Sequence, residues 1–139
     1  MLILFWMLLT GYAIGMVLPF CFPGRPDRQG LAAGGSAIVA SSAGIAMGAL
    51  GFAASQPFTA AIESTIPLLT FAIRLDPLAS FFLLTVSLVG LAASIYGLGY
   101  LRHFHGRASI TALGSLFNAF LCSMMLVILA DNGFFFLIA

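Results

Sequence analysis

The polar residue best placed to do chemistry in this sequence is an asparagine inside an apolar run. Asn118 lies in the stretch from Ala108 to Ala130, which contains no charged residue, and Ser115 and Ser123 are close to it in the sequence. An amide at such a position can line a wet cavity or form an interhelical hydrogen bond, and the latter contributes about 0.6 to 2 kcal/mol. We predict that Asn118 joins two helices.

The sequence gives less support for a metal site or a reactive thiol than for a structural role of Asn118. His103 and His105 supply two ligands in a short basic loop, whereas a structural zinc site is usually four-coordinate. Cys21 and Cys122 both lie within apolar runs, at different expected depths, and are interpreted as small packing residues. With no nucleotide-binding loop, nucleophile motif or cysteine cluster, we predict no catalytic, cofactor-binding or metal residue.

The elements that must position these side chains are membrane helices. Of the 139 residues, 62% are hydrophobic and 6% are charged, whereas soluble domains are about 25% charged. The net charge of +1 and the lack of a Lys/Arg run exclude a nucleic-acid binder. The lipid bilayer is therefore the predicted environment.

Turn residues and charges divide the sequence into apolar runs. Crossing a hydrocarbon core of about 30 Å takes about 20 helical residues, and four runs are long enough, near residues 1–22, 31–54, 77–101 and 109–130. A further apolar run begins at residue 133. The predicted fold class is an all-α membrane protein with four transmembrane helices and the start of a fifth.

The last apolar run, Phe134–Ala139, is far shorter than a membrane span. Residues 1–139 are accordingly expected to form a single transmembrane region and an N-terminal fragment of a longer subunit. None of the four complete spans contains an ionisable residue of the kind that ion pathways use. We therefore expect this chain alone to move no protons or sodium ions.

The arginines predict an orientation. Arg25, Arg28, Arg102 and Arg107 lie in the first and third connections, and Arg74 alone lies in the second. Because Lys and Arg are enriched in cytoplasmic loops, these two connections are placed in the cytoplasm and the N-terminus outside.

The second connection carries a strand signal. From Thr70 to Asp76 the residues alternate, with Phe71, Ile73 and Leu75 on one face and Arg74 and Asp76 on the other. We predict a short extracytoplasmic strand or hairpin. Asp76-Pro77 then suits the start of a helix, since Asp is a favoured N-cap and Pro a favoured first residue.

Small residues predict where helices touch. Gly11 and Gly15, and likewise Gly44 and Gly48, form G-x-x-x-G motifs, and the second span is rich in Gly, Ala and Ser. Such residues allow helix backbones to approach closely. The second span is expected to be central in the bundle.

Four segments together resemble a known family: Arg74–Phe81, Ile95–Leu101 before the basic loop, Phe117-Asn118 and Ala130–Ala139. They are similar to the N-terminal part of the antiporter-like membrane subunit of hydrogenase-4 and formate hydrogenlyase, of component B or subunit 3 type. That family is related to the proton-pumping membrane subunits of NADH-quinone oxidoreductase (complex I).

The resemblance implies a multi-pass subunit of the bacterial cytoplasmic membrane that couples electron transfer to ion movement. Its partners would be the other membrane and peripheral subunits of the complex. The family's coupling carboxylate and lysines fall on helices beyond Ala139, so the part that matches is scaffold. Asp76, Asn118, Asp131 and Asn132 correspond to motif positions and are interpreted as structural.

Two other functions remain open from the residues. One is a self-sufficient four-helix transporter, which should carry a carboxylate within a span. The other is a membrane scaffold or assembly protein without transport.

Overall fold

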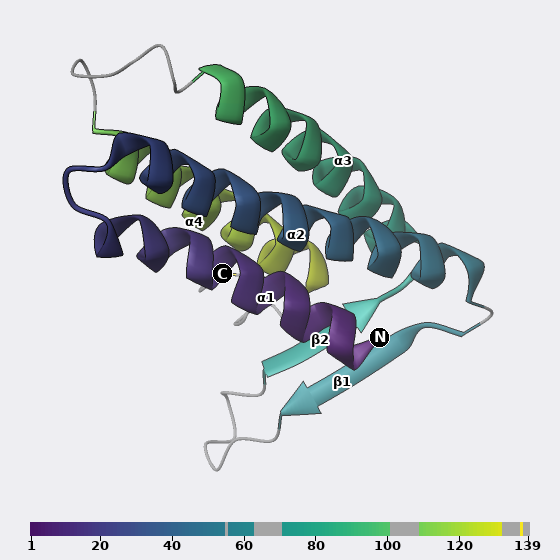
Figure 1. The fold of residues 1–139 in the computed structure, drawn as a ribbon. Helices are drawn as coiled ribbons and strands as arrows, with labels where there is room; N and C mark the ends of the chain where they lie inside the picture. The colour runs from purple at the N-terminus through teal and green to yellow at the C-terminus, as the bar shows by residue number, and fades with distance from the viewer. Residues whose placement is uncertain (55, 63–70, 101–108, 132–136, 138–139) are drawn as a thin grey trace.

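The described residues form a bundle of four long helices with a small sheet at one end (Figure 1). The computed structural model describes residues 1–54, 56–62, 71–100, 109–131 and 137. In chain order the elements are α1 (Leu2–Val17), the 3-10 helix η1 (Leu18–Cys21), α2 (Pro26–Ala53), β1 (Phe58–Ile62), β2 (Phe71–Leu75), α3 (Pro77–Tyr100) and α4 (Ile110–Leu129).

The four predicted spans are present as helices. The segments Leu2–Cys21, Asp27–Ala53, Pro77–Tyr100 and Ile110–Leu129 are each long and apolar enough to cross a membrane. Their exposed large hydrophobic side chains are mainly Leu, Ile, Val and Phe, which suits a surface that faces lipid. The predicted start of a fifth span falls mostly outside the described residues.

Helix α2 begins earlier than the uncharged run predicted. Pro26 is at its start and Asp27 is in its first turn, so part of the predicted loop is helical. Proline fits the first helical position because it has no N–H to leave unpaired, and an acidic residue there complements the helix dipole. Gln29 also donates from Nε2 to the Phe22 carbonyl at 2.9 Å, which ties the connection to the helix.

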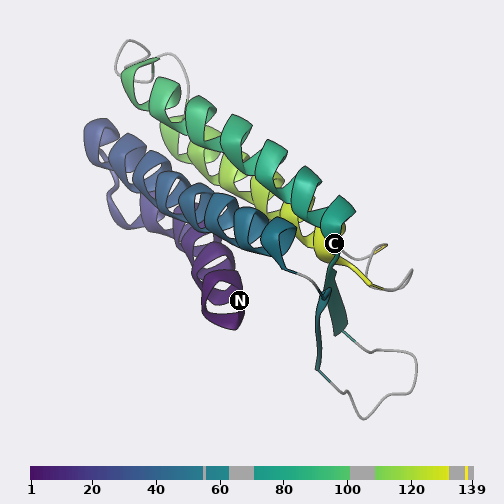
Figure 2. The ribbon, with the colours of Figure 1, turned by 90° about the vertical axis from the view of Figure 1, so that its right-hand side faces the viewer.

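Helix α2 is the centre of the bundle, as predicted. Helices α1, α3 and α4 all pack against it, and Figure 2 shows it between α1 and α3. Its buried residues recur at intervals of three and four, the spacing of helices that cross at a small angle. They include Gly30, Ala33, Ala37, Ala40, Gly44, Met47 and Gly51.

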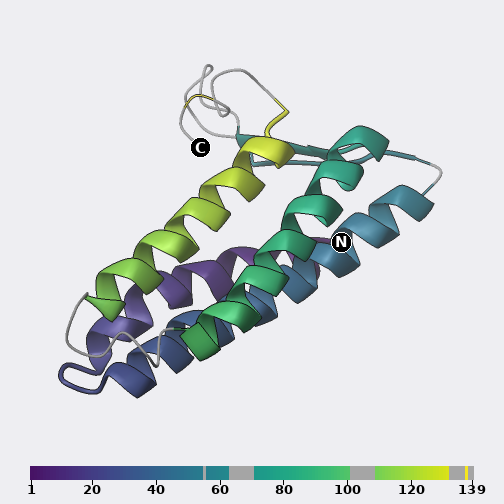
Figure 3. The same ribbon diagram turned by 90° about the horizontal axis from the view of Figure 1, so that it is seen from above.

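The predicted strand is confirmed and has a partner. β2 pairs with β1 in antiparallel register, with Phe58 opposite Leu75 and Ala60 opposite Ile73. Ile73 and Leu75 are buried, and Arg74 between them is exposed, as the alternation predicted. Figure 3 shows the sheet across the end of the bundle where α4 ends.

The two residues that follow α4 pair with the other edge of β2. Ile73 forms a β-bridge with Ala130, and the Asp131 N–H donates to the Ala72 carbonyl at 2.9 Å. Arg74 Nη1 lies 3.8 Å from Asp131 Oδ1, but both side chains are partly exposed and such pairs contribute little. Backbone pairing and the burial of Ile73 and Leu75 in the core together fix the sheet to the bundle.

Asp76 caps α3 as predicted. Its Oδ1 accepts from the Ala79 N–H at 2.7 Å, and its carbonyl accepts from the Ser80 N–H at 2.8 Å. The cap joins the end of β2 directly to the first turn of α3.

Replacing Asp76 with alanine should lower the free energy of unfolding by about 1 kcal/mol, because one N–H at the start of α3 loses its acceptor. SDS titration of the protein in mixed micelles, followed by circular dichroism, measures the loss. Asp76→Ser keeps an N-cap oxygen and should retain most of the stability. Equal losses for both variants would show that the cap is not the cause.

Candidate functional site

Asn118 joins α4 to α2 by a buried hydrogen bond. The side chain is fully buried, and its Nδ2 donates to the Ala33 carbonyl of α2 at 3.1 Å. The same nitrogen donates to the Gly114 carbonyl of α4 at 2.9 Å. This confirms the interhelical bond predicted for Asn118.

The two serines near Asn118 differ in what they bind. Ser115 Oγ donates to the Met16 carbonyl of α1 at 2.7 Å, so it too joins two helices. Ser123 Oγ donates to the Phe120 carbonyl of its own helix at 2.9 Å. Helix α4 is therefore hydrogen-bonded to α1 through Ser115 and to α2 through Asn118.

The other side of the Asn118 amide faces a glycine and a serine. Asn118 Oδ1 is buried and accepts no hydrogen bond within the described part of the chain. A Cβ atom on Gly15 of α1 would meet both this oxygen and Ser36 Oγ of α2. Ser36 Oγ donates to the Ala33 carbonyl at 3.0 Å. We name Gly15, Ala33, Ser36 and Asn118 the Asn118 cluster; it exists because Gly15 has no side chain.

The other G-x-x-x-G glycines are also close contacts, as predicted. A Cβ on Gly11 would lie 2.9 Å from Ala40 Cβ, and one on Gly48 would lie 3.0 Å from the Ser80 carbonyl oxygen. A Cβ on Gly44 would meet the Ser87 hydroxyl. These contacts bring α1 and α3 against α2, the close approach that small residues allow in membranes.

A second buried polar contact has no signal in the sequence. The Tyr12 hydroxyl and Ser41 Oγ lie 3.0 Å apart between α1 and α2, and both residues are fully buried. On α3, Ser80, Ser87 and Ser94 are buried at intervals of seven residues. That spacing was visible in the sequence and marks one face of a helix.

The polar groups gathered here carry no charge, and Ser80 Oγ, like Asn118 Oδ1, has no hydrogen-bond partner within the described residues. In the described helices, charged residues occur only at Asp27 and Arg28, both at the start of α2. Cys122 is buried in α4, and Cys21 is exposed at the end of η1. Within the described residues no three His, Cys, Asp or Glu side chains are grouped as metal ligands. His103 and His105 lie outside the described residues, as do Glu63, Arg102, Arg107 and Asn132.

Two comparisons with known proteins match part of this chain. The family described as NADH-ubiquinone oxidoreductase (complex I), chain 5 N-terminus, matches residues 67–109. Hydrogenase-4 component B of Escherichia coli (strain K12) is 35% identical over 66 residues, which is 48% of this chain. The predicted resemblance is confirmed.

The similarity to the Escherichia coli protein is limited in length. It covers 10% of the length of the Escherichia coli protein, so this chain is similar to a small part of that relative. The family match includes β2, the Asp76 cap and α3. Asn118 lies beyond it. The segment that matches the family is thus the capped strand-to-helix connection and the helix that follows.

Proposed function

We propose that this chain is the N-terminal helical part of an antiporter-like, proton-translocating membrane subunit of a hydrogenase, formate hydrogenlyase or complex I type assembly. The observation that carries the proposal is the match of residues 67–109 to the N-terminal family of complex I chain 5. Four helices able to span a membrane and the similarity to hydrogenase-4 component B support it.

Within such a subunit, the role of these helices is structural: they pack against one another and fix one another's orientation. Two features support this role: the Asn118 cluster joins α4 to α2 through neutral groups, and the small residues of α2 bring its neighbours close. Coupling of electron transfer to ion movement is assigned to other parts of the subunit. The expectation that the chain alone transports no ions stays a prediction.

Purification from the source cells tests the function. A tagged chain, extracted in mild detergent, should migrate on native gels with other membrane subunits and with redox subunits, which peptide mass spectrometry identifies. An unrelated tagged membrane protein from the same cells is the control. A chain that migrates without any redox subunit would contradict the proposal and favour a membrane scaffold outside such complexes.

The orientation with the N-terminus outside is also proposed. Arg25 lies in the connection after η1 and Arg28 in the first turn of α2, at the end of the bundle opposite the sheet (Figure 1). If these arginines are cytoplasmic, the sheet and the N-terminus are on the outer side. The sheet is then the predicted extracytoplasmic hairpin.

Cysteine labelling should reveal this orientation. In a Cys21→Ala, Cys122→Ala background, a cysteine replacing the exposed Gln56 should react with an impermeant maleimide in intact cells. One replacing the exposed Pro23 should react only after the cells are permeabilised. If only the variant with a cysteine at Pro23 were labelled in intact cells, the orientation would be the reverse of the one proposed.

A further inference from the structure

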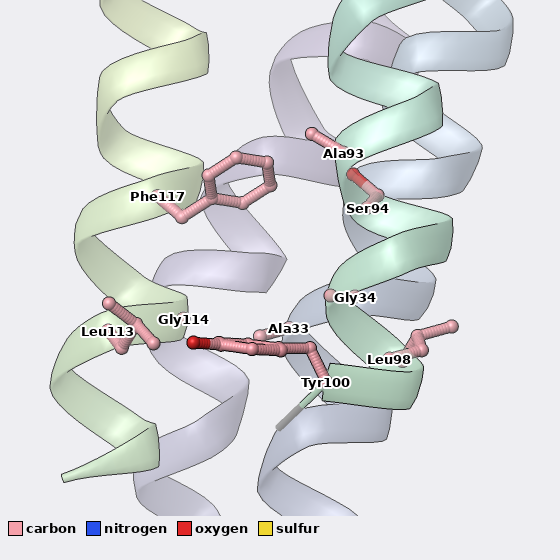
Figure 4. A pocket seen from close by; sticks show the side chains of 10 residues that line it. Ala33, Gly34, Ala93, Ser94, Leu98, Tyr100, Leu113, Gly114 and Phe117 are labelled. Atoms are coloured by element: carbon pink, nitrogen blue, oxygen red, sulfur yellow. The ribbon is translucent and has the colours of Figure 1, made fainter. Parts of the chain in front are cut away.

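A cavity of about 200 Å³ lies between α2, α3 and α4. Its wall consists mainly of small residues from all three helices: Ala33, Gly34, Ala93, Gly97 and Gly114. In Figure 4 the Phe117 ring projects from α4, and the Tyr100 ring extends from the end of α3 toward α4. The cavity is therefore bounded by membrane-spanning helices on three sides.

The wall of the cavity suits hydrocarbon and not water. The Ser94 hydroxyl on it already donates to the Gly90 carbonyl at 2.6 Å. A buried water needs two to four polar partners, whereas an apolar cavity of about 150 Å³ stays dry and binds benzene. A cavity of about 200 Å³ has room for a length of alkyl chain.

Two tyrosines indicate how deep the cavity lies in the bilayer. Tyr96 and Tyr100 are 70% and 48% exposed, and their rings stack with centroids 5.7 Å apart at the end of α3. Exposed tyrosines are enriched where membrane meets water. From Tyr100 to Ala93 a helix runs about 10 Å, so the cavity reaches from this boundary into the hydrocarbon layer.

The sequence from α3 to α4 is basic. No acidic residue occurs from Pro77 to Ala130, and the sequence that joins α3 to α4 contains Arg102 and Arg107. Basic groups at the membrane surface attract the phosphate of lipid headgroups. A transmembrane helix, about 10 Å across with its side chains, would cover this cavity without entering it.

We propose that one acyl chain of a bilayer phospholipid occupies this cavity, with its headgroup on the side of Tyr100. The chain then fills the space between α3 and α4, which contact each other less than either contacts α2. This site requires a cavity mouth that faces lipid and is not covered by another helix, and it does not depend on the ion-translocating role of the proposed function.

Quenching of tryptophan by brominated phospholipid tests the site. The full chain carries one tryptophan, Trp6; in a Trp6→Phe background, Phe117→Trp places the reporter on the cavity wall. Leu116→Trp, at a side chain 69% exposed, reports ordinary contact with lipid. In vesicles of phosphatidylglycerol with dibrominated chains, we expect both reporters to be quenched.

Filling the cavity supplies the decisive comparison. Gly97 is on the cavity wall, and a Cβ there, as on Gly99, has no atom within 4 Å. In the Phe117→Trp reporter protein, the further substitution Gly97→Leu should remove most of the quenching. The matched substitution Gly99→Leu should leave the quenching unchanged. Unchanged quenching at Leu116→Trp confirms that the variants are folded and inserted. The proposal would be wrong if brominated lipid did not quench the Phe117→Trp reporter. It would also be wrong if the reporter stayed quenched after Gly97→Leu.

Discussion

Replacing Gly15 with valine should lower the free energy of unfolding by about 1–3 kcal/mol, the usual cost of overpacking a filled interior. A Cβ at this position already meets Asn118 Oδ1 and Ser36 Oγ, and valine adds two methyl groups. The Asn118 amide cannot simply turn away, since its Nδ2 is bound to the Ala33 and Gly114 carbonyls. Either α1 moves away from α2 and α4, or these bonds lengthen.

The matched control for this substitution is Gly35→Val in α2. A Cβ on Gly35 has no atom within 4 Å, and both changes place a β-branched residue in a helix, so the intrinsic helix propensity changes equally. SDS titration should therefore show a clear loss for Gly15→Val and a small one for Gly35→Val.

A second background identifies the contact that causes the loss. In Asn118→Ala the amide is absent, so Gly15→Val should cost less there than in the native chain. Coupled effects of this kind are expected for residues in contact. If Gly15→Val cost the same in both backgrounds, the contact with Asn118 would not be its cause.

The features that the sequence predicted are those with local signals. Uncharged runs mark the spans, alternation in Thr70–Asp76 marks β2, and Asp76-Pro77 marks the start of α3. Each depends on residues that are neighbours in the chain. The start of α2 at Pro26 was missed because absence of charge marks the apolar part of a helix and not its first turns.

The contacts that the sequence did not predict join residues far apart in the chain. Tyr12 with Ser41 and Ser115 with the Met16 carbonyl depend on how the helices are rotated against one another. The bridge from Ile73 to Ala130 depends on where α4 ends relative to the sheet. Helix rotation is set by packing across the whole bundle, which no single segment determines.

Asn118 illustrates both cases. Its position in an uncharged run was enough to predict an interhelical bond, because a buried amide needs partners. Its acceptor was not predictable, since a backbone carbonyl such as that of Ala33 carries no side-chain signal. Nor was the role of Gly15 in leaving room for the amide.

Replacing Asn118 with aspartate should be more damaging than replacing it with leucine, although aspartate has the closer shape. Leucine loses the bond to Ala33, worth about 0.6 to 2 kcal/mol, but adds no charge, and the Ala33 carbonyl still accepts from Ser36. An aspartate carboxylate would face the Ala33 and Gly114 carbonyls with an acceptor in place of a donor. Insertion scales add about 2.5–3.5 kcal/mol for a charge at the centre of a membrane helix.

The expected order of stability in SDS titration is native, then Asn118→Leu, then Asn118→Asp. Ser123→Ala serves as the control, because the Ser123 hydroxyl bonds only to its own helix and its loss should change little. An Asn118→Asp protein that is as stable as Asn118→Leu, and whose carboxyl group is shown by infrared spectroscopy to be ionised, would mean that water reaches this position and hydrates the carboxylate. The Asn118 cluster would then be part of an aqueous pathway, and the packing role assigned to it here would be wrong.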